Sequence, residues 1–225
     1  MQKNQQDQEN HVDEQPEKPD RAAAFKNYFT ATRISYIAIF TALAYVLYLP
    51  YFEFPIIPAV PYLKIDFSNT FVMIAGFSLG PVAGMVVGIL KEILHSLTFS
   101  QTVGIGELAN ILMMTPFVLL PSILYKKHKG IKSVIISLVL ACLLQTAVSV
   151  PVNYTLTFPF FLSVSAGKTW TEGMEFYLSV WYWAVLFNFV KTLLISAAVM
   201  LLYKPLSRVI KLTNAKFSKK KDQNR

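Results

Sequence analysis

The sequence predicts an all-α integral membrane protein, a six-transmembrane-helix bundle with both termini in the cytoplasm. The first observation is composition: 54% of the 225 residues are hydrophobic and 15% are charged. The mean hydropathy is +0.44, which is typical of membrane proteins rather than soluble globules. The second observation is a series of apolar runs separated by proline, glycine or charged residues. The third is the uneven distribution of lysine and arginine between these runs.

Basic residues gather beside alternate apolar runs. Segment 126–132 carries four lysines and the tail after Tyr203 carries eight basic residues, whereas the connections between them on the other side carry few. Because cytoplasmic loops are enriched in lysine and arginine, segment 126–132 and both termini are expected in the cytoplasm. Membrane orientation thus explains the net charge of +8. The expected surroundings are a lipid bilayer, and no nucleic acid is an expected partner.

Three regions follow from the same pattern. Residues 1–30 are polar and mixed in charge, which predicts a disordered N-terminal tail and no cleaved leader. Residues 31–211 form the predicted membrane domain, and 212–225 a basic cytoplasmic tail. The predicted spans, each allowed about 20 residues or fewer, are 33–49, 70–77, 82–97, 105–125, 133–154 and 180–203.

The first span contains two alanines four residues apart, Ala38 and Ala42. Small residues at this spacing let another helix approach closely. Two readings are open: ordinary packing within this chain, or docking of a partner subunit. After the span come four prolines between Pro50 and Pro61, which exclude a continuous helix. This apolar segment is expected to cover the bundle as a lid or to lie in the membrane interface.

The second and third spans are separated by a helix break at Gly80-Pro81. In the third span, Gly84 and Gly88 allow close helix packing. Lys91 lies near the far end of the span and is expected to extend its ammonium group to the membrane interface. Its neighbour Glu92 is a candidate for the mouth of a cavity.

The fourth span begins with Glu107 and Asn110, which share one helix face at a spacing of three. A carboxylate in the first turn also suits the helix dipole, so Glu107 has a purely structural reading too. The fifth span contains Gln145 and ends with Asn153. Residues 155–179 then form the longest predicted connection inside the membrane domain.

The sixth span carries Asn188 and Lys191 near its middle, again on one face. A lysine at this depth costs a few kcal/mol or more, so it needs a partner and a bundle interior or wet cavity. We interpret the pair as the core of a binding site. The alternative is that Lys191 pairs with a buried carboxylate and only holds helices together. Asn153 can meet this face at the outer side, and paired amides suit a planar, neutral ligand.

Motifs for catalysis or tightly bound cofactors are lacking in the sequence. No Walker-type phosphate loop, zinc spacing or nucleophile elbow is present. The single cysteine, Cys142, excludes a disulfide framework. We therefore expect no enzyme activity, no catalytic residue, no metal and no cofactor.

Short segments along the chain resemble, in order, the substrate-binding S component of energy-coupling factor (ECF) vitamin transporters, most of all the riboflavin-specific member. They are LKIDFS (63–68), GFSLGPVAG (76–84), GELAN (106–110), VNY (152–154), FNFVK (187–191) and LYK (202–204). The Gly-Pro break is shared by many S components. The combination of LKIDFS, GELAN, the asparagine of the fifth span and Asn-x-x-Lys looks more specific to riboflavin. The resemblance covers about residues 33–211.

This resemblance implies a multi-pass protein of a bacterial plasma membrane that captures riboflavin from outside. Uptake would require a transmembrane T subunit and two ATP-binding subunits. The isoalloxazine ring would be held by Asn153, Asn188 and Lys191, and Ala38 and Ala42 would meet the T subunit. The remaining substrate-binding residues expected from LKIDFS and GELAN are Leu63, Lys64, Asp66, Glu107 and Asn110.

Other functions stay open on sequence grounds. An S component for pantothenate or folate would use Lys191 as the counter-ion of a carboxylate. A small stand-alone secondary transporter and a membrane-embedded enzyme are less well supported, since the chain shows no internal repeat and no acid–base or metal constellation. Binding of FMN beside riboflavin is left undecided.

Overall fold

The computed structural model describes residues 28–57, 63–100, 102, 104–128 and 130–223, and it describes side chains as far as Pro205. The chain divides into two units, Met1–Ile34 and Ser35–Arg225, and the fold discussed below is that of the second. Most of the predicted disordered tail lies outside the described residues. So do Pro58 and Pro61 of the proline-rich segment.

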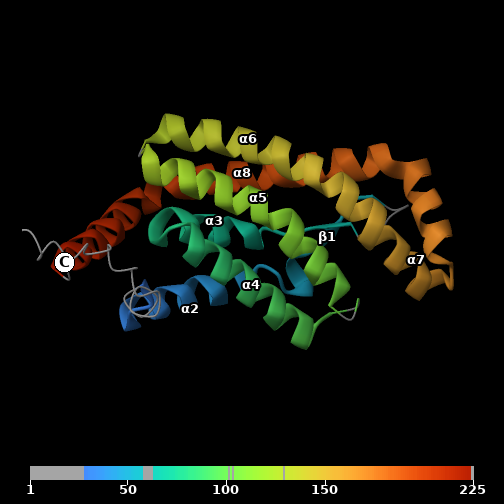
Figure 1. Cartoon of the computed structure of the whole chain (residues 1–225), viewed down its shortest axis with the longest axis horizontal. Helices are drawn as coiled ribbons and strands as arrows, with labels where there is room; N and C mark the ends of the chain where they lie inside the picture. The colour runs from blue at the N-terminus through green and yellow to red at the C-terminus, as the bar shows by residue number, and fades with distance from the viewer. Residues whose placement is uncertain (1–27, 58–62, 101, 103, 129, 224–225) are drawn as a thin grey trace, which may run out of the picture. The chain divides into compact units, whose positions relative to one another are not determined.

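Helices make up nearly all of the described structure (Figure 1). The first helix, α2, precedes a short irregular segment with a two-stranded antiparallel ribbon, in which Phe54 pairs with Ile65. The elements in order are α2 (Ala31–Val46), the 3-10 turn η1 (Pro50–Phe52), β1 (Phe54–Pro55), β2 (Lys64–Ile65), α3 (Ser68–Leu79), α4 (Pro81–Thr98), α5 (Ile105–Lys127), α6 (Ile131–Val152), the π-helical segment η2 (Asn153–Thr157), α7 (Phe158–Ala166) and α8 (Trp170–Gln223).

Helix length and composition fit a membrane protein. Within the described residues, four helical stretches are long and apolar enough to cross a bilayer, namely Pro81–Thr98, Ile105–Lys127, Ile131–Ala166 and Trp170–Pro205. Helices α2 and α3 are apolar but shorter. Large apolar side chains such as Ile39, Leu143 and Leu193 are exposed on the outer faces, as a hydrocarbon environment requires. The predicted all-α membrane fold is confirmed, and the count of six crossings stays a prediction.

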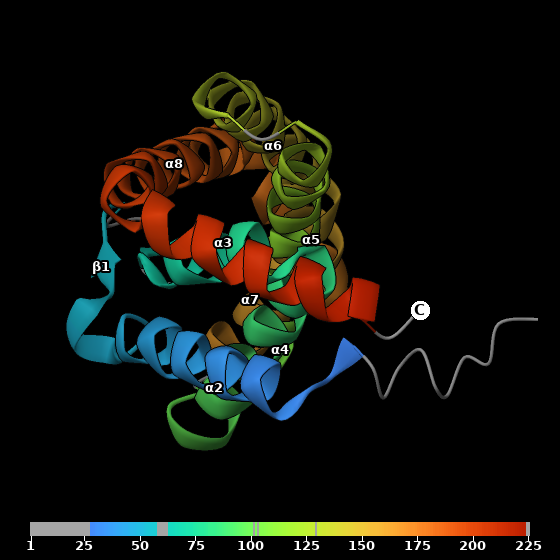
Figure 2. The same cartoon turned by 90° about the vertical axis from the view of Figure 1, so that its left-hand side faces the viewer.

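Helix α3 lies at the centre of the bundle, where it contacts α4, α5 and α8 (Figure 2). Every residue from Ser68 to Leu79 except Phe71 is buried. Neighbouring pairs are α4 with α5, α5 with α6, and α6 with α8. Because α3 is enclosed by these helices, the polar residues at its N-terminal end lie inside the protein.

The predicted break between the second and third spans is confirmed. Gly80 has a φ of 98°, a conformation that residues with a Cβ rarely adopt. Pro81 follows at the first position of α4, where a missing N–H costs nothing. This turn folds α4 back onto α3, and a Cβ added at Gly84 would lie 2.8 Å from the Cα of Gly76. The two helix backbones therefore touch.

We expect Gly84→Ala to destabilise the protein by about 1–3 kcal/mol, because the neighbouring backbone cannot move away from the added methyl group. Thermal unfolding in detergent measures the effect. The matched control is Gly130→Ala, since a Cβ at Gly130 meets nothing within 4 Å. Equal melting temperatures for the two variants would contradict the close approach.

The prediction of a long connection over 155–179 is wrong. Helix α6 continues through η2 and α7 as far as Ala166, and α8 begins at Trp170. The turn between α7 and α8 is built by a capping box at Thr169 and Glu172. The Glu172 carboxylate accepts a hydrogen bond from Thr169 N at 2.8 Å, and Thr169 Oγ1 accepts one from Glu172 N at 3.3 Å. Glu172 therefore caps the start of α8, where the sequence predicts a connection.

Helix α8 is longer than the predicted sixth span. Its backbone stays helical to Gln223, whereas the span was predicted to end at residue 203, and the end of the membrane domain at residue 211 stays a prediction. The side chains of the predicted basic tail, 212–225, lie outside the described residues.

Candidate functional site

A cavity of about 140 Å³ lies between the β1–β2 ribbon, α4, α5, η2, α7 and α8. All eight residues predicted to bind substrate line it, and they come from four separate stretches of the chain. They are Leu63, Lys64, Asp66, Glu107, Asn110, Asn153, Asn188 and Lys191. The structure thus brings the predicted residues together, and their binding of a ligand stays a prediction.

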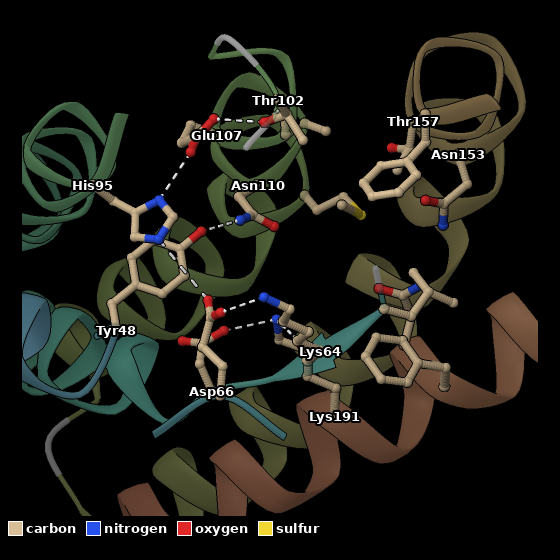
Figure 3. Close-up of a pocket in the computed structure, with 18 of the residues that line it drawn as sticks. Tyr48, Lys64, Asp66, His95, Thr102, Glu107, Asn110, Asn153, Thr157 and Lys191 are labelled. Atoms are coloured by element: carbon tan, nitrogen blue, oxygen red, sulfur yellow. Dashed lines mark hydrogen bonds and ion pairs between the residues drawn. The ribbon is translucent and has the colours of Figure 1, made fainter. Parts of the chain in front are cut away.

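One end of the cavity carries Asn153 and Thr157, which Figure 3 shows apart from His95 and Glu107. Asn153 belongs to the π-helical segment and is 1% exposed. Within the described residues, neither its Oδ1 nor its Nδ2 has a hydrogen-bond partner, and the same holds for Oγ1 of Thr157. Asn188 donates from Nδ2 to the carbonyl oxygen of Ala184 at 2.9 Å. Buried polar groups are nearly always hydrogen-bonded, so this end has bonding capacity for a ligand.

An ion pair lies in the middle of the cavity. Lys191 Nζ donates to Asp66 Oδ2 at 2.8 Å and to the carbonyl oxygen of Lys64 at 3.2 Å. The alternative in which Lys191 pairs with a buried carboxylate is therefore correct about the pairing. Lys191 nevertheless lines the cavity. An ammonium group has three N–H donors, so one donor is left over after these two bonds.

Asp66 is held in its charged form. Burial alone would raise the pKa of its carboxyl group, but the charges of Lys191 and Lys91 outweigh this effect. Hydrogen bonds from Lys191 and Ser68 act in the same direction, so the pKa of Asp66 lies well below its usual range. Asp66 Oδ1 accepts hydrogen bonds from both the backbone N–H, at 3.0 Å, and the hydroxyl of Ser68. Asp66 therefore ties the start of α3 to α8 through Lys191.

The other end of the cavity carries ionisable groups. Glu107 is the centre of this cluster: its carboxylate contacts His95 Nδ1 at 2.8 Å and accepts hydrogen bonds from Ser100 at 3.1 Å and Thr102 at 3.0 Å. The structural reading of Glu107 as a helix-start residue is consistent with its place in the first turn of α5. Its side chain nevertheless reaches the cavity wall.

Twelve of the cavity residues were not predicted from the sequence, and three of them, Tyr48, Glu53 and His95, carry ionisable side chains. The Tyr48 ring stacks on the His95 ring with centroids 4.0 Å apart, and Asn110 donates to the Tyr48 hydroxyl at 2.6 Å. The usable signal for His95 was an ionisable residue twelve positions before Glu107, across one short connection. No spacing signal exists for Tyr48 and Glu53, because both lie in the irregular segment after α2.

Two sequence expectations about α4 are wrong. Lys91 does not reach the membrane interface, and Glu92 does not line the cavity; each is 1% exposed. Their ammonium and carboxylate groups lie 3.0 Å apart. The physical reason is the position of α4 beside the buried start of α3, where Ser68 accepts a hydrogen bond from Lys91 at 2.6 Å. A buried lysine with such partners has no need to extend to water.

The alanine pair of α2 points away from the bundle. Ala38 and Ala42 are both exposed, whereas Ile37, Thr41 and Ala44 are buried. Packing against the described side chains therefore does not explain the pair, and docking of a partner stays a prediction. Across the described residues, no three His, Cys, Asp or Glu side chains form a group suited to a metal ion.

A sequence profile of the family described as "ECF transporter, substrate-specific component" matches residues 32–203. The chain belongs to this family. As an S component it is a part of a transporter and not an enzyme, and its apolar helices place it in a bacterial membrane.

Relatives of this S component carry riboflavin in their names. Riboflavin transporter RibU of Staphylococcus aureus is 32% identical over 179 residues, which cover 80% of this chain and 92% of the relative. RibU of Streptococcus thermophilus is 32% identical over 190 residues, covering 83% and 89%. A solved structure described as the S component of a bacterial ECF transporter superposes with a TM-score of 0.64 at 32% identity, covering 80% of this chain and 98% of that one.

Proposed function

We propose that this S component binds riboflavin in the described cavity. It captures the vitamin from outside the cell and mediates its uptake with a transmembrane T subunit and two ATP-binding subunits. The chain crosses the plasma membrane six times, with both termini in the cytoplasm. Support comes from the names of the relatives and above all from one observation: the buried Asn153 amide faces the cavity with no hydrogen-bond partner among the described residues.

The amide end suits the flavin ring. One edge of isoalloxazine alternates carbonyl oxygens with an N–H, and an amide offers a donor and an acceptor side by side. Asn153 and Asn188 supply such amides, and the remaining N–H of Lys191 can donate to a ring carbonyl. Phe187, which also lines the cavity, provides apolar surface for the ring face.

The opposite end suits the ribityl chain. Its lining side chains are hydroxyl, amide, imidazole and carboxylate groups, which donate to and accept from sugar hydroxyls. Tyr48, His95, Thr102, Glu107 and Asn110 supply them, and Figure 3 shows them apart from Asn153 and Thr157. The polarity of the cavity therefore changes along its length as that of riboflavin does.

Charge disfavours the other vitamins considered. Pantothenate and folate carry carboxylates, but Lys191 already faces Asp66 at 2.8 Å. At the far end, Lys64 already faces Glu53 at 2.9 Å and His95 contacts Glu107 at 2.8 Å. Each basic side chain that lines the cavity therefore already has a carboxylate partner. For the same reason we propose that FMN binds more weakly than riboflavin, since its phosphate would lie at this end.

The deciding experiment is spectroscopic. Detergent-purified protein is examined for the visible absorbance of a flavin and then titrated with riboflavin, FMN, pantothenate and folate, following flavin fluorescence or competition with it. Quenching by stoichiometric protein supports the proposal. A colourless preparation that leaves riboflavin fluorescence unchanged refutes it, and binding of pantothenate or folate would then identify a different vitamin.

We expect Asn153→Leu to weaken riboflavin binding by more than about tenfold, or ~1.4 kcal/mol. Stability without ligand should stay the same or rise, because the substitution removes a buried amide that lacks partners. Gln145→Leu is the matched control: Gln145 is buried in α6, its Oε1 is also unpaired within the described residues, and it does not line the cavity. Equal affinities for both variants would place the ligand elsewhere.

A further inference from the structure

A second buried charge pair lies behind the wall of the cavity. Lys91 and Glu92 are neighbours on α4, each 1% exposed, and neither lines the cavity. Such groups are expensive in a membrane protein and are most often retained for function. The proposed riboflavin contacts leave both of them without a role.

Lys91 is connected to the cavity through Asp66. Its Nζ donates to Ser68 Oγ at 2.6 Å, and this hydroxyl donates in turn to Asp66 Oδ1. The other carboxylate oxygen, Oδ2, receives Lys191 at 2.8 Å. Asp66 thus lies between two cations, one direct and one reached through a hydroxyl. The ammonium of Lys91 also lies 4.3 Å from the ring centre of Tyr48, a cavity residue.

Lys91 has two carboxylates within reach, Glu92 directly and Asp66 through the Ser68 hydroxyl. The ammonium and carboxylate of the pair are 3.0 Å apart, but neither Glu92 oxygen accepts a hydrogen bond from any described residue. The hydrogen bond of Lys91 that the structure contains is the one directed to Ser68. Neutralising Glu92 therefore does not by itself account for the hydrogen bond from Lys91 to Ser68.

We propose that Lys91 is a positioning residue for the ligand site: it shares the charge of Asp66, so that Lys191 keeps positive charge and a free N–H for the ligand. Without Lys91, Asp66 would have Lys191 as its one close cation and would hold it more tightly. The ammonium would then be both turned away from the cavity and neutralised. This inference rests on the proposed function, because riboflavin is the ligand used to detect it.

The test uses three variants of the full chain, all of which carry Glu92→Gln to remove the second carboxylate. In Glu92→Gln alone, Asp66 is the carboxylate that Lys91 still reaches, through Ser68. The riboflavin affinity of this variant is expected to stay within about threefold of the wild-type value. Lys91→Met with Glu92→Gln leaves a balanced Asp66–Lys191 pair, so the fold is retained, but the affinity should fall by about tenfold or more. Lys91→Arg with Glu92→Gln restores the cation and should recover most of the affinity.

Fluorescence titration and thermal unfolding of the same preparations separate the outcomes. Normal binding by the Met variant would show that Lys91 only neutralises Glu92 and would overturn the inference. Equally weak binding by the Arg and Met variants would also overturn it, because charge at position 91 would not matter. Unfolding of the Met variant alone would assign Lys91 to assembly of the bundle instead. If the wild-type protein does not bind riboflavin, the proposed function is wrong, and this outcome is distinct from the failure of the inference about Lys91.

Discussion

Replacing Lys191 with methionine is expected to weaken riboflavin binding by more than about tenfold, or ~1.4 kcal/mol, and to destabilise the ligand-free protein as well. The sequence alone predicts the loss of binding with the fold left intact. The structure adds the second effect, because Asp66 is buried and has Lys191 as its direct ion-pair partner at 2.8 Å. Removing one partner of a buried pair costs about 3 kcal/mol or more.

A double variant separates the two effects of Lys191. Lys191→Met with Asp66→Asn removes both charges, so the stranded carboxylate disappears and stability should return. Riboflavin binding should stay weak, because the donor to the ring is still missing. Thermal unfolding in detergent and fluorescence titration measure the two quantities. If Lys191→Met binds riboflavin normally, the cavity is not the site; if it melts like the wild type, the ion pair contributes nothing to stability.

Ala42→Trp is expected to abolish riboflavin uptake by cells while the purified protein still binds the vitamin, and Ala38→Trp should behave in the same way. Both alanines are exposed on α2, and small exposed residues four apart permit close contact with a helix of another subunit. An indole group at either position would hold the T subunit away. The effect is large because uptake depends on the assembled transporter, whereas binding depends only on a cavity that neither alanine lines.

The control for this experiment is Leu143→Trp, at an exposed apolar position of α6. It places the same indole group on a different outer face and should leave both uptake and binding unchanged. Uptake by cells that also produce the T and ATP-binding subunits is compared with titration of the purified S component. Loss of binding in Ala42→Trp would mean that the alanine pair supports the fold of this chain, and normal uptake would remove α2 as the docking face.

Several features of the fold follow from local sequence. Apolar runs predict buried or lipid-facing helices because backbone groups in hydrocarbon must be satisfied within the segment. Gly80 and Pro81 determine the break between α3 and α4, since the φ of 98° at Gly80 suits glycine and proline can begin a helix. The stretch 155–179 is predicted as a connection, but it contains η2, α7 and the start of α8. The local signal that contradicts this reading is the capping box at Thr169 and Glu172.

The membership of the candidate site was also accessible from sequence. Asn188 and Lys191 share a helix face by their spacing alone, and the resemblance of LKIDFS and GELAN to S components supplied Asp66, Glu107 and the others. The sequence could not predict that Tyr48 and Glu53 line the cavity. Both lie in the irregular segment after α2, and a non-helical segment has no regular spacing from which the direction of a side chain can be predicted.

The sequence by itself determined that this protein is an all-helical membrane protein and which helix faces are polar, because both depend on residue type and helical spacing. Only the tertiary structure decided which charges meet. Lys191 pairs with a carboxylate 125 positions away, and Lys91 turns inward to Ser68, 23 positions away. In a low-dielectric interior, a buried charge pairs with whichever opposite charge or polar group the packed helices place beside it. Which residue that is depends on how the helices pack in three dimensions, because the partners are far apart in the sequence.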